Sequence, residues 1–378
     1  MEYIRRILSD KIIEAFPFYS VILITGPRQS GKTTLCKNLF PNYKYYNLEN
    51  PSLRDIIKDD PTKFIFDSKE GFIIDEVQHM PQLMSYIQVC VDENPDRKFI
   101  LTGSSDFALM ETITQSLAGR AALFTLLPFS FKEIKDYIRN NGIDLIMSNG
   151  FYPGIIVKQT PAEIFYSNYV STYLERDLRN IKAIESLDLF RLFMKVLASR
   201  ASCEFNASSI SAEIGVSAPT IRNWLGLLKT SYITFTLQPY YTNIGKRLSK
   251  TPKIYFYDTG LLCYLLDIHN PVELQNHPLR GAIFENLALT QFIKEKFNKK
   301  ENSDLFFYRE NKGREIDVVK SEGLHLNLYE IKSSKTFNKD FTKNLKDIKN
   351  LLGDKVSSTT LIYDGESFPP DIINIRDL

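Results

Sequence analysis

The sequence has few cysteines and no paired cysteine motif. Its four cysteines are scattered through 378 residues without a C-x-x-C spacing, at Cys36, Cys90, Cys203 and Cys263. Disulfide-stabilised domains and structural zinc sites both need cysteines at recognisable spacings. The pattern therefore argues against a disulfide framework and against a zinc site, and it favours a reducing compartment such as the cytoplasm.

Long apolar runs and an excess of one charge are also lacking. The stretch from Met1 to Ile13 mixes charges with isolated apolar residues, which predicts neither a signal peptide nor a membrane span. We expect a soluble, intracellular protein. The 47 Lys and Arg residues nearly balance the 45 Asp and Glu residues, so a nucleic-acid surface would have to be a local patch. A length of 378 residues exceeds the usual size of one hydrophobic core and predicts two or three domains.

A glycine-rich loop follows the first strongly apolar run. Residues 26–34 read Gly-Pro-Arg-Gln-Ser-Gly-Lys-Thr-Thr, between the apolar run 21–24 and a stretch with helical spacing. In a GxxxxGK[ST] loop, backbone N–H groups surround the phosphates at a helix N-terminus, the lysine reaches the β- and γ-phosphates, and the following hydroxyl binds Mg²⁺. The loop predicts a nucleoside triphosphate site made by Gly26, Pro27, Arg28, Gln29, Ser30, Gly31, Lys32, Thr33 and Thr34.

The segments after the loop predict a β-α-β start and a second motif. A short helix over 33–40 and a strand over 43–48 precede the apolar run 71–76, which ends in Asp75 and Glu76. In a phosphate-binding fold, one carboxylate at such a strand end can hold the metal and the other can activate the attacking water. We assign Asp75 to the metal and Glu76 to the water. The alternative is a core strand that happens to end in acids.

Two more strands are expected over 98–103 and 121–127. The first ends at a polar pair, and Ser104 is the candidate for sensing the γ-phosphate or the attacking water, with Ser105 and Thr102 as alternatives. The second follows Arg120, which is placed to act as an arginine finger on the nucleotide of a neighbouring subunit. It is equally consistent with a simple ion pair between Arg120 and an acid.

The middle of the chain predicts helices and a DNA-binding motif. Residues 130–200 show mostly helical spacing, interrupted by a loop at 150–154, and predict a lid over the nucleotide. Residues 210–228 predict a helix, a tight turn at Gly215 and a second helix capped by Ser217.

This helix-turn-helix is followed by the β-prone stretch 232–241 and a basic hairpin that would form a wing. If the unit binds DNA, the second helix would present Thr220, Arg222 and Asn223 to the major groove. The wing would contact phosphates through Lys246, Arg247, Lys250 and Lys253. The alternative is a winged helix that packs against the core and binds no DNA. Trp224 is expected in the core.

The C-terminal region predicts a hairpin that carries acids and a lysine. Strands over 314–319 and 328–332 would place Asp317, Glu330 and Lys332 at one edge, and a helix over 280–297 could add Glu285. Two carboxylates can hold a divalent cation, while a lysine positions a nucleophile or stabilises charge. Acid-x-Lys triplets occur elsewhere in this chain, so only the combination of strand, second strand and helix indicates a site.

These motifs together resemble a known family. Residues 20–130 resemble the core of AAA-type ATPases, and in particular a prokaryotic group in which the Gly-Pro-Arg-Gln-Ser-Gly-Lys-Thr-Thr loop, Ile-Asp-Glu, Leu-Thr-Gly-Ser-Ser and Leu-Ala-Gly-Arg recur in this order. Elements of that group at 128–133 and 173–177 extend the resemblance over nearly the whole chain. It implies ATP and Mg²⁺ as cofactors and a restriction-endonuclease-like, PD-(D/E)XK domain of the DUF4143 type. Its nuclease positions match Glu285, Asp317, Glu330 and Lys332, although the family includes members whose activity is undemonstrated or lost.

We therefore expect an α/β protein. It would have a P-loop, AAA-type parallel sheet core over 1–130, a helical lid over 131–186, a winged helix-turn-helix over 187–260 and a restriction-endonuclease-like α/β domain over 261–378. The leading hypothesis is an ATPase that acts on branched or broken DNA as a homo-oligomer or ring, with a metal-dependent nuclease-like domain. A second hypothesis is a nucleotide-operated switch whose later domains only bind DNA or a protein partner. A third is a self-associating ATPase without a DNA partner.

Overall fold

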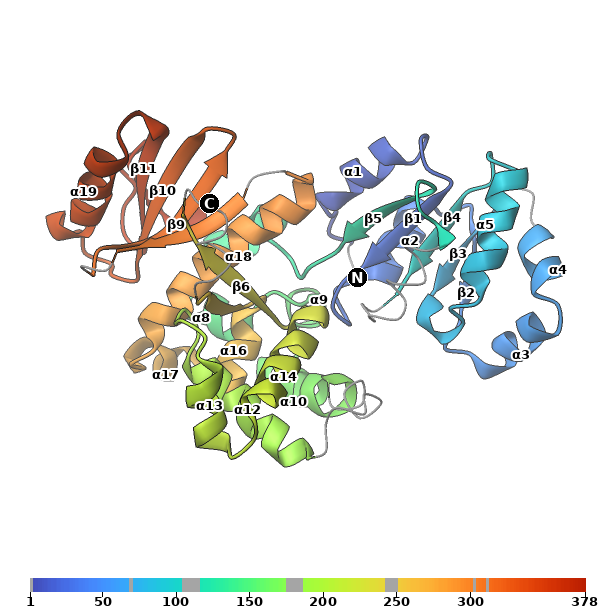
Figure 1. Ribbon diagram of the computed structural model, residues 1–378, viewed down its shortest axis with the longest axis horizontal. Helices are drawn as coiled ribbons and strands as arrows, with labels where there is room; N and C mark the ends of the chain where they lie inside the picture. The colour runs from blue at the N-terminus through green and yellow to red at the C-terminus, as the bar shows by residue number, and fades with distance from the viewer. Residues whose placement is uncertain are drawn as a thin grey trace.

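The chain folds into two lobes that are joined by the segment after residue 125 (Figure 1). The computed structural model describes residues 3–67, 71–103, 116–174, 186–241, 251–301, 304–310 and 313–378. Several candidate residues lie outside these described residues, namely Ser104, Ser105, Lys246, Arg247 and Lys250.

The N-terminal lobe is built on a five-stranded parallel sheet. Its strands, in the spatial order β2-β3-β4-β1-β5, are β2 (Lys44–Asn47), β3 (Phe72–Asp75), β4 (Phe99–Thr102), β1 (Val21–Thr25) and β5 (Ala121–Thr125). Crossovers between parallel strands place helices on the two faces of such a sheet. Those helices are α1 (Leu8–Ala15), α2 (Lys32–Leu39), α3 (Pro51–Asp59), α4 (Pro61–Phe66) and α5 (Leu83–Glu93).

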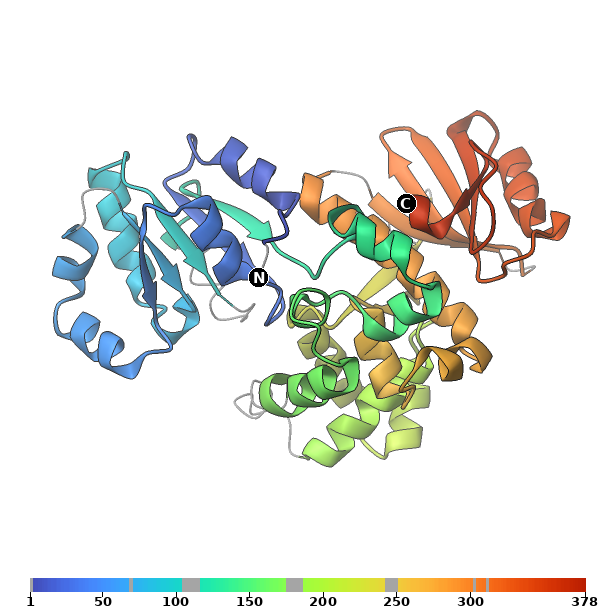
Figure 2. The ribbon, with the colours of Figure 1, turned by 180° about the vertical axis from the view of Figure 1, so that it is seen from behind.

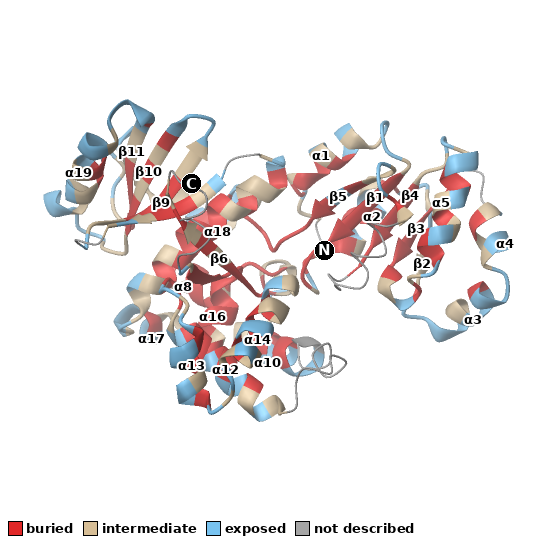
Figure 3. Ribbon diagram, in the orientation of Figure 1, coloured by how far each residue is buried: buried red, intermediate tan, exposed pale blue. Residues whose placement is uncertain are grey.

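The strand order explains where the motifs of the N-terminal lobe meet. Strands β1, β3 and β4 are buried along their whole length, as the continuous apolar runs predicted (Figure 3). Since every pairing is parallel, the carboxyl ends of these strands share one edge of the sheet. The glycine-rich loop after β1, Asp75 at the end of β3 and Thr102 at the end of β4 all lie at this edge. The predicted strands are confirmed with bounds that differ by one or two residues.

The second lobe combines helices with a seven-stranded sheet (Figure 2). The sheet order is β12 (Ile372–Asn374), β11 (Val356–Tyr363), β10 (His325–Lys332), β9 (Glu315–Glu322), β8 (Asp304–Arg309), β6 (Thr234–Pro239) and β7 (Lys253–Phe256). The long helix α18 (Arg280–Lys299) packs on the sheet together with residues of the main core, and α19 (Lys343–Leu352) packs with a second apolar cluster. The predicted hairpin of β9 and β10 is confirmed.

The other helices of this lobe gather beside α18 and the β6 end of the sheet (Figure 1). They are the 3₁₀ turn Phe131–Glu133, α7 (Lys135–Asn140), α8 (Ile143–Asn149), α9 (Pro153–Ile156), α10 (Ala162–Asn168), the π-helical turn Tyr169–Leu174, α12 (Leu187–Ser199), α13 (Ala207–Ile214), α14 (Ala218–Thr230), α16 (Thr259–Leu265) and α17 (Pro271–Asn276). Among the described residues, no helix is long and apolar enough to cross a membrane.

The helix, turn and helix over 207–230 form as their sequence predicts. Gly215 ends α13 in the left-handed region at φ 83°, and the hydroxyl of Ser217 caps α14 by accepting from the N–H of Thr220. Trp224 is buried against the rings of Phe190 and Phe193, which confirms it as a core residue.

The β6–β7 hairpin is not a free wing. Strand β6 pairs in parallel with β8, so the hairpin extends the C-terminal sheet, and one hydrophobic core runs from Leu127 to Ile375. The predicted division at residue 260 therefore does not separate two cores. Lys253 in β7 is only 4 % exposed, so its predicted role as a phosphate contact of the wing is wrong. Its side chain lies inside because the partly buried carboxylates of Glu285 and Glu315 balance its charge there.

Candidate active site

The phosphate loop depends on glycines at both of its ends. Gly26 has φ 139°, and a Cβ there would lie 2.2 Å from the carbonyl oxygen of Leu126. Gly31 has φ 97° and forms the N-cap of α2, so it places the helix N-terminus at the end of the loop. The loop thus leads directly into the N-terminus of α2, which is where the GxxxxGK[ST] pattern expects a phosphate.

Lys32 is buried in the loop, with 5 % of its surface exposed. Its Nζ donates to the carbonyl oxygens of Gly26 at 3.0 Å and Pro27 at 2.9 Å. Burial lowers the pKa of Lys32, and the negative charges of Glu76 and Asp75 oppose that shift. The ammonium group is therefore held at the loop by backbone oxygens that a phosphate can replace.

The carboxylate of Asp75 accepts hydrogen bonds from hydroxyl groups of three other elements. Its Oδ2 accepts from Thr33 Oγ1 at 2.7 Å and from Tyr45 Oη at 2.6 Å, and its Oδ1 accepts from Thr102. The structure thus brings together Thr33 and Asp75, which the sequence assigned to one metal. Tyr45 in β2 was not anticipated; burial and its bond to Asp75 raise the pKa of this phenol. Thr102, which the sequence offered as an alternative to Ser104, is a β4 hydroxyl that the structure describes at this site, whereas Ser104 lies outside the described residues.

Glu76 lies beside this cluster in a strained backbone conformation. Its φ of 57° and ψ of 49° put a non-glycine residue in the left-handed region, which costs about 1 to 3 kcal/mol. Its carboxylate accepts a hydrogen bond from the side chain of Gln78, and its N–H lies 3.4 Å from Thr102 Oγ1. The local strain turns Glu76 out of the strand directly after Asp75.

Arg120 lies at the opposite edge of the sheet, because it precedes β5. Its Nη2 donates to Asp92 Oδ2 at 2.8 Å and its Nε to the other carboxylate oxygen. This is the ion pair that the sequence offered as the alternative to an arginine finger. The position keeps Arg120 away from the phosphate loop of its own chain, so a finger role would require a neighbouring subunit.

The second lobe reaches the phosphate loop at two points. A Cβ on Gly31 would lie 3.8 Å from Pro153 Cγ, which places the predicted lid loop beside the helix N-terminus. Tyr232, directly after α14, has its hydroxyl 3.4 Å from Thr25 Oγ1 and 3.2 Å from Thr125 Oγ1. Pro153 of the lid loop and Tyr232 after the helix-turn-helix therefore lie near the edge of the sheet that carries the loop.

The C-terminal acids come from helix α18 and from strands β9 and β10. Lys332 Nζ donates to Glu330 Oε1 at 2.6 Å, and Asp317 Oδ2 accepts from the N–H of Ile331 at 2.7 Å. The other oxygen of Glu330, Oε2, is buried without a hydrogen-bond partner. Burial raises the pKa values of Glu285, Asp317 and Glu330, and the charge of Asp317 raises those of the two glutamates further.

Strand β7 adds two residues that sequence reasoning did not place here. Tyr255 donates to Glu285 Oε1 at 2.6 Å, and Lys253 Nζ lies 3.3 Å from the same oxygen while it also pairs with Glu315. Although burial opposes the charge of Lys253, the surrounding carboxylates raise its pKa. The alternation of side chains along a strand puts Lys253 and Tyr255 on one face, which is the sequence signal that they act together. In the described part of the chain, no three His, Cys, Asp or Glu side chains form a ready-made metal site.

The helix-turn-helix leaves part of its second helix available. Arg222 and Asn223 are exposed on α14, whereas Thr220 is partly buried and its hydroxyl bonds to that of Ser217 at 2.8 Å. Two of the three predicted base contacts are thus free to reach a partner, and the third belongs to the helix cap.

Family comparisons divide the chain into three matched parts. Residues 19–135 match the sequence model of an AAA domain. The N-terminal lobe has the fold of an AAA-type P-loop ATPase. Residues 140–272 match a domain of unknown function, DUF8612, and residues 280–376 match another, DUF4143, as the sequence suggested for the C-terminal region.

The chain is also similar to several known proteins. An uncharacterised protein of Mycobacterium tuberculosis is 28 % identical over 319 residues, which cover 83 % of this chain and 70 % of that protein. An uncharacterised protein of Methanocaldococcus jannaschii is 24 % identical over 389 residues, covering 92 % and 82 %.

Among solved structures, a Walker-type ATPase of Pyrococcus abyssi is 16 % identical, with a TM-score of 0.45 over 68 % of this chain and 94 % of that one. The RuvB Holliday junction branch migration motor of Thermotoga maritima is 16 % identical, with a TM-score of 0.33 over 60 % and 88 %. These overall likenesses are too distant to indicate a function.

Proposed function

We propose that the protein binds and hydrolyses ATP at the loop over residues 26–34. The observation that carries this proposal is the 2.7 Å bond between Thr33 Oγ1 and Asp75 Oδ2, which joins the loop to the acidic end of β3. A hydroxyl and a carboxylate are hard oxygen ligands of the kind that Mg²⁺ prefers, so these two residues would hold the ion. When bound, Mg²⁺ would neutralise negative charge on the phosphates as the reaction proceeds.

Other residues of the site would bind the phosphates and activate the attacking water. Lys32 releases the carbonyl oxygens of Gly26 and Pro27 and donates to phosphate oxygens, which are stronger acceptors because they are charged. Glu76 accepts the proton of the attacking water or orients that water. Tyr45 and Thr102 fix the carboxylate of Asp75 by donating to it.

Replacing Glu76 with glutamine should separate binding from hydrolysis. Glutamine keeps the size of the side chain but cannot take a proton, so we expect ATP to bind normally while kcat falls by about 100-fold or more. Phosphate release and retention of radiolabelled ATP measure the two steps. Glu93→Gln is the matched control, because Glu93 is exposed at the opposite edge of the sheet. Hydrolysis by Glu76→Gln at the parent rate would rule out this role.

A second candidate activity is metal-dependent cleavage of nucleic acid in the C-terminal region. The observation that favours it is the buried Glu330 Oε2, which has no partner although it belongs to a cluster of charged groups. When ionised, Glu285, Glu315, Asp317 and Glu330 exceed Lys253 and Lys332 by two negative charges. A divalent cation would balance this excess. Glu285, Asp317 and Glu330 would hold it, and when bound it would activate water and polarise a phosphodiester.

DNA is the proposed partner for this activity. The exposed Arg222 and Asn223 of α14 would contact base edges, while Lys246, Arg247 and Lys250 would contact phosphates. Lys332, bonded to Glu330, would position the nucleophile. Arg120 would act on the nucleotide of a neighbouring subunit in a homo-oligomer or ring.

Asp317→Asn should abolish Mg²⁺- or Mn²⁺-dependent cleavage of DNA, because an amide removes one of the charges that would hold the metal. Linear, nicked and branched DNA incubated with ATP and metal report cleavage, and binding is measured on the same substrates. Lys332→Ala should also lose cleavage. Asp304→Asn is the matched control and should cleave like the parent, because Asp304 is exposed on β8.

Two results would contradict the DNA proposal in different ways. If the parent protein cuts none of the substrates but binds them, the nuclease-like region serves binding, as expected for a nucleotide-operated switch. If it binds none of them, DNA is not the partner, and regulation of a protein partner or self-association of the ATPase remains.

A further inference from the structure

Arg6 lies at the junction between the phosphate loop and the second lobe. Only 3 % of its surface is exposed. Its guanidinium group donates to three acceptors: Nη1 to the carbonyl oxygen of Ser30 at 2.9 Å, Nη2 to that of Leu127 at 2.6 Å, and Nε to Glu133 Oε1 at 2.9 Å. Its buried charge is therefore shared between the loop, the segment after β5 and the first turn of the second lobe.

The contact with Ser30 fixes the direction of an N–H group in the phosphate loop. The carbonyl of Ser30 and the N–H of Gly31 belong to the same peptide group, and in a trans peptide they point in opposite directions. Because Arg6 holds the carbonyl on its own side, the N–H of Gly31 must point to the other side. In loops of this type, phosphates are bound by N–H groups that converge on the side away from the carbonyls.

The other side of Arg6 belongs to the segment over 127–133. Glu133 Oε1 also accepts from the N–H of Ile7 at 3.0 Å, and its Oε2 accepts from the N–H of Ser130 at 2.8 Å. The guanidinium group stacks over the ring of Phe129, 4.6 Å from its centroid. Although burial opposes ionisation, Arg6 and these hydrogen bonds hold the pKa of Glu133 below its ordinary value.

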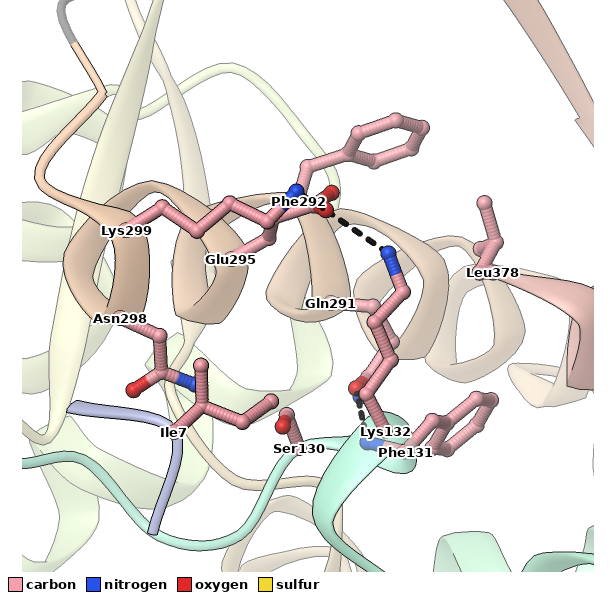
Figure 4. A pocket seen from close by; sticks show the side chains of 10 residues that line it. All are labelled: Ile7, Ser130, Phe131, Lys132, Gln291, Phe292, Glu295, Asn298, Lys299 and Leu378. Atoms are coloured by element: carbon pink, nitrogen blue, oxygen red, sulfur yellow. Dashed lines mark hydrogen bonds and ion pairs between the residues drawn. The ribbon is translucent and has the colours of Figure 1, made fainter. Parts of the chain in front are cut away.

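Helix α18 also contacts this segment. Lys294 Nζ donates to the carbonyl oxygen of Phe129 at 2.8 Å, and Gln291 Oε1 accepts from the N–H of Phe131 at 2.9 Å. Figure 4 shows Ser130, Phe131 and Lys132 beside Gln291 and Glu295 of α18, with Ile7 next to them. The segment thus contacts both Arg6 and α18.

We propose that Arg6 is a positioning residue that couples the conformation of the phosphate loop to the docking of α18. The guanidinium group is a rigid planar fork, so a shift of the Ser30 carbonyl on nucleotide binding changes the geometry at Leu127 and Glu133 as well. Helix α18 carries Glu285, so this contact links the two candidate sites. The inference rests on the proposed nucleotide binding at the loop.

Arg6→Lys tests the positioning role, because lysine keeps the charge but cannot bond three acceptors in one plane. We expect its affinity for a fluorescent ATP analogue to be about tenfold lower than that of the parent protein. Arg5→Lys is the matched control and should bind like the parent, because Arg5 is exposed and pairs with Asp10. Circular dichroism and thermal melting establish that both variants fold.

Hydrogen exchange tests the coupling itself. In the parent protein, saturating nucleotide should change the exchange rates of amides in the loop, in 127–133 and in α18. In Arg6→Lys at saturating nucleotide, the change in the loop should remain and the change in α18 should be lost. A residue that only stabilises the fold would not separate the two responses.

The outcomes distinguish this inference from the proposed function. If the parent protein does not bind the nucleotide, the proposed ATPase function fails. If the parent binds and Arg6→Lys shows the same affinity and the same α18 response, the coupling role of Arg6 is wrong. Should Arg6→Lys fail to fold, Glu133→Gln weakens the same junction, and an unchanged affinity and α18 response in that variant would overturn the inference.

Discussion

Lys32→Ala should lower the affinity for ATP by at least about 100-fold and abolish hydrolysis. Lys32 is the cation that the loop buries beside the expected phosphates, and charge-assisted hydrogen bonds contribute about 1.5 to 3 kcal/mol each. Its ammonium group already lies within hydrogen-bond distance of two loop carbonyls, so it needs only to exchange acceptors. Titration with a fluorescent ATP analogue and phosphate release measure the two effects.

Lys44→Ala is the matched control for this experiment. Lys44 begins β2 and is exposed, so its removal should leave both binding and hydrolysis unchanged. Alanine at position 32 also removes a lysine whose charge is disfavoured by burial, so the variant should fold as well as the parent. Parent-like turnover by folded Lys32→Ala would place the nucleotide elsewhere in the protein.

The N-terminal site was predictable because each of its parts is a local pattern. Strands β1, β3 and β4 of the parallel sheet are short apolar runs that end in glycine or polar residues, and parallel strands end at one edge. The phosphate-loop motif and the acidic strand end assigned Thr33 and Asp75 to one metal, and the structure joins them by a hydrogen bond. The helix-turn-helix was equally local, since Gly215 and Ser217 mark its turn.

The parts that sequence reasoning missed depend on contacts between distant segments. Arg6 stands in a stretch of mixed charges, and its partner Glu133 lies 127 residues away. Lys253 looked like one more surface lysine of a basic hairpin, but its burial follows from Glu285 and Glu315, which lie in other elements. The pairing of β6 with β8 likewise joins segments that are far apart in the sequence, so no local pattern of apolar residues predicts it.

Lys294→Met should make the protein more stable at neutral pH by about 2 kcal/mol. Lys294 is 1 % exposed, and burial lowers its pKa from 10.5 to about 7, while Asp258 and Glu133 act to raise that pKa and Arg6 acts to lower it further. At about 1.4 kcal/mol per pKa unit, ionising this group inside the fold costs about 5 kcal/mol at pH 7 and below. Methionine removes that cost but leaves the Phe129 carbonyl without its donor, which costs about 1 to 3 kcal/mol.

The sign of this effect should reverse as the pH rises. Between about pH 7 and 10.5, the unfolded chain keeps a proton that folded Lys294 has released, so the stability of the parent protein increases with pH across this window. The advantage of Lys294→Met should therefore shrink from pH 7 upward, and the variant should become the less stable protein near pH 10.5, where only the lost hydrogen bond distinguishes the two. Urea unfolding followed by circular dichroism at several pH values measures the difference.

Lys299→Met on the same helix should show no gain at pH 7, because Lys299 is exposed and pairs with Glu295 at 2.6 Å. A Lys294→Met variant that is less stable than the parent at pH 7 would contradict this prediction. It would mean that the bond from Lys294 to Phe129 stabilises the fold by more than the burial of the charge costs.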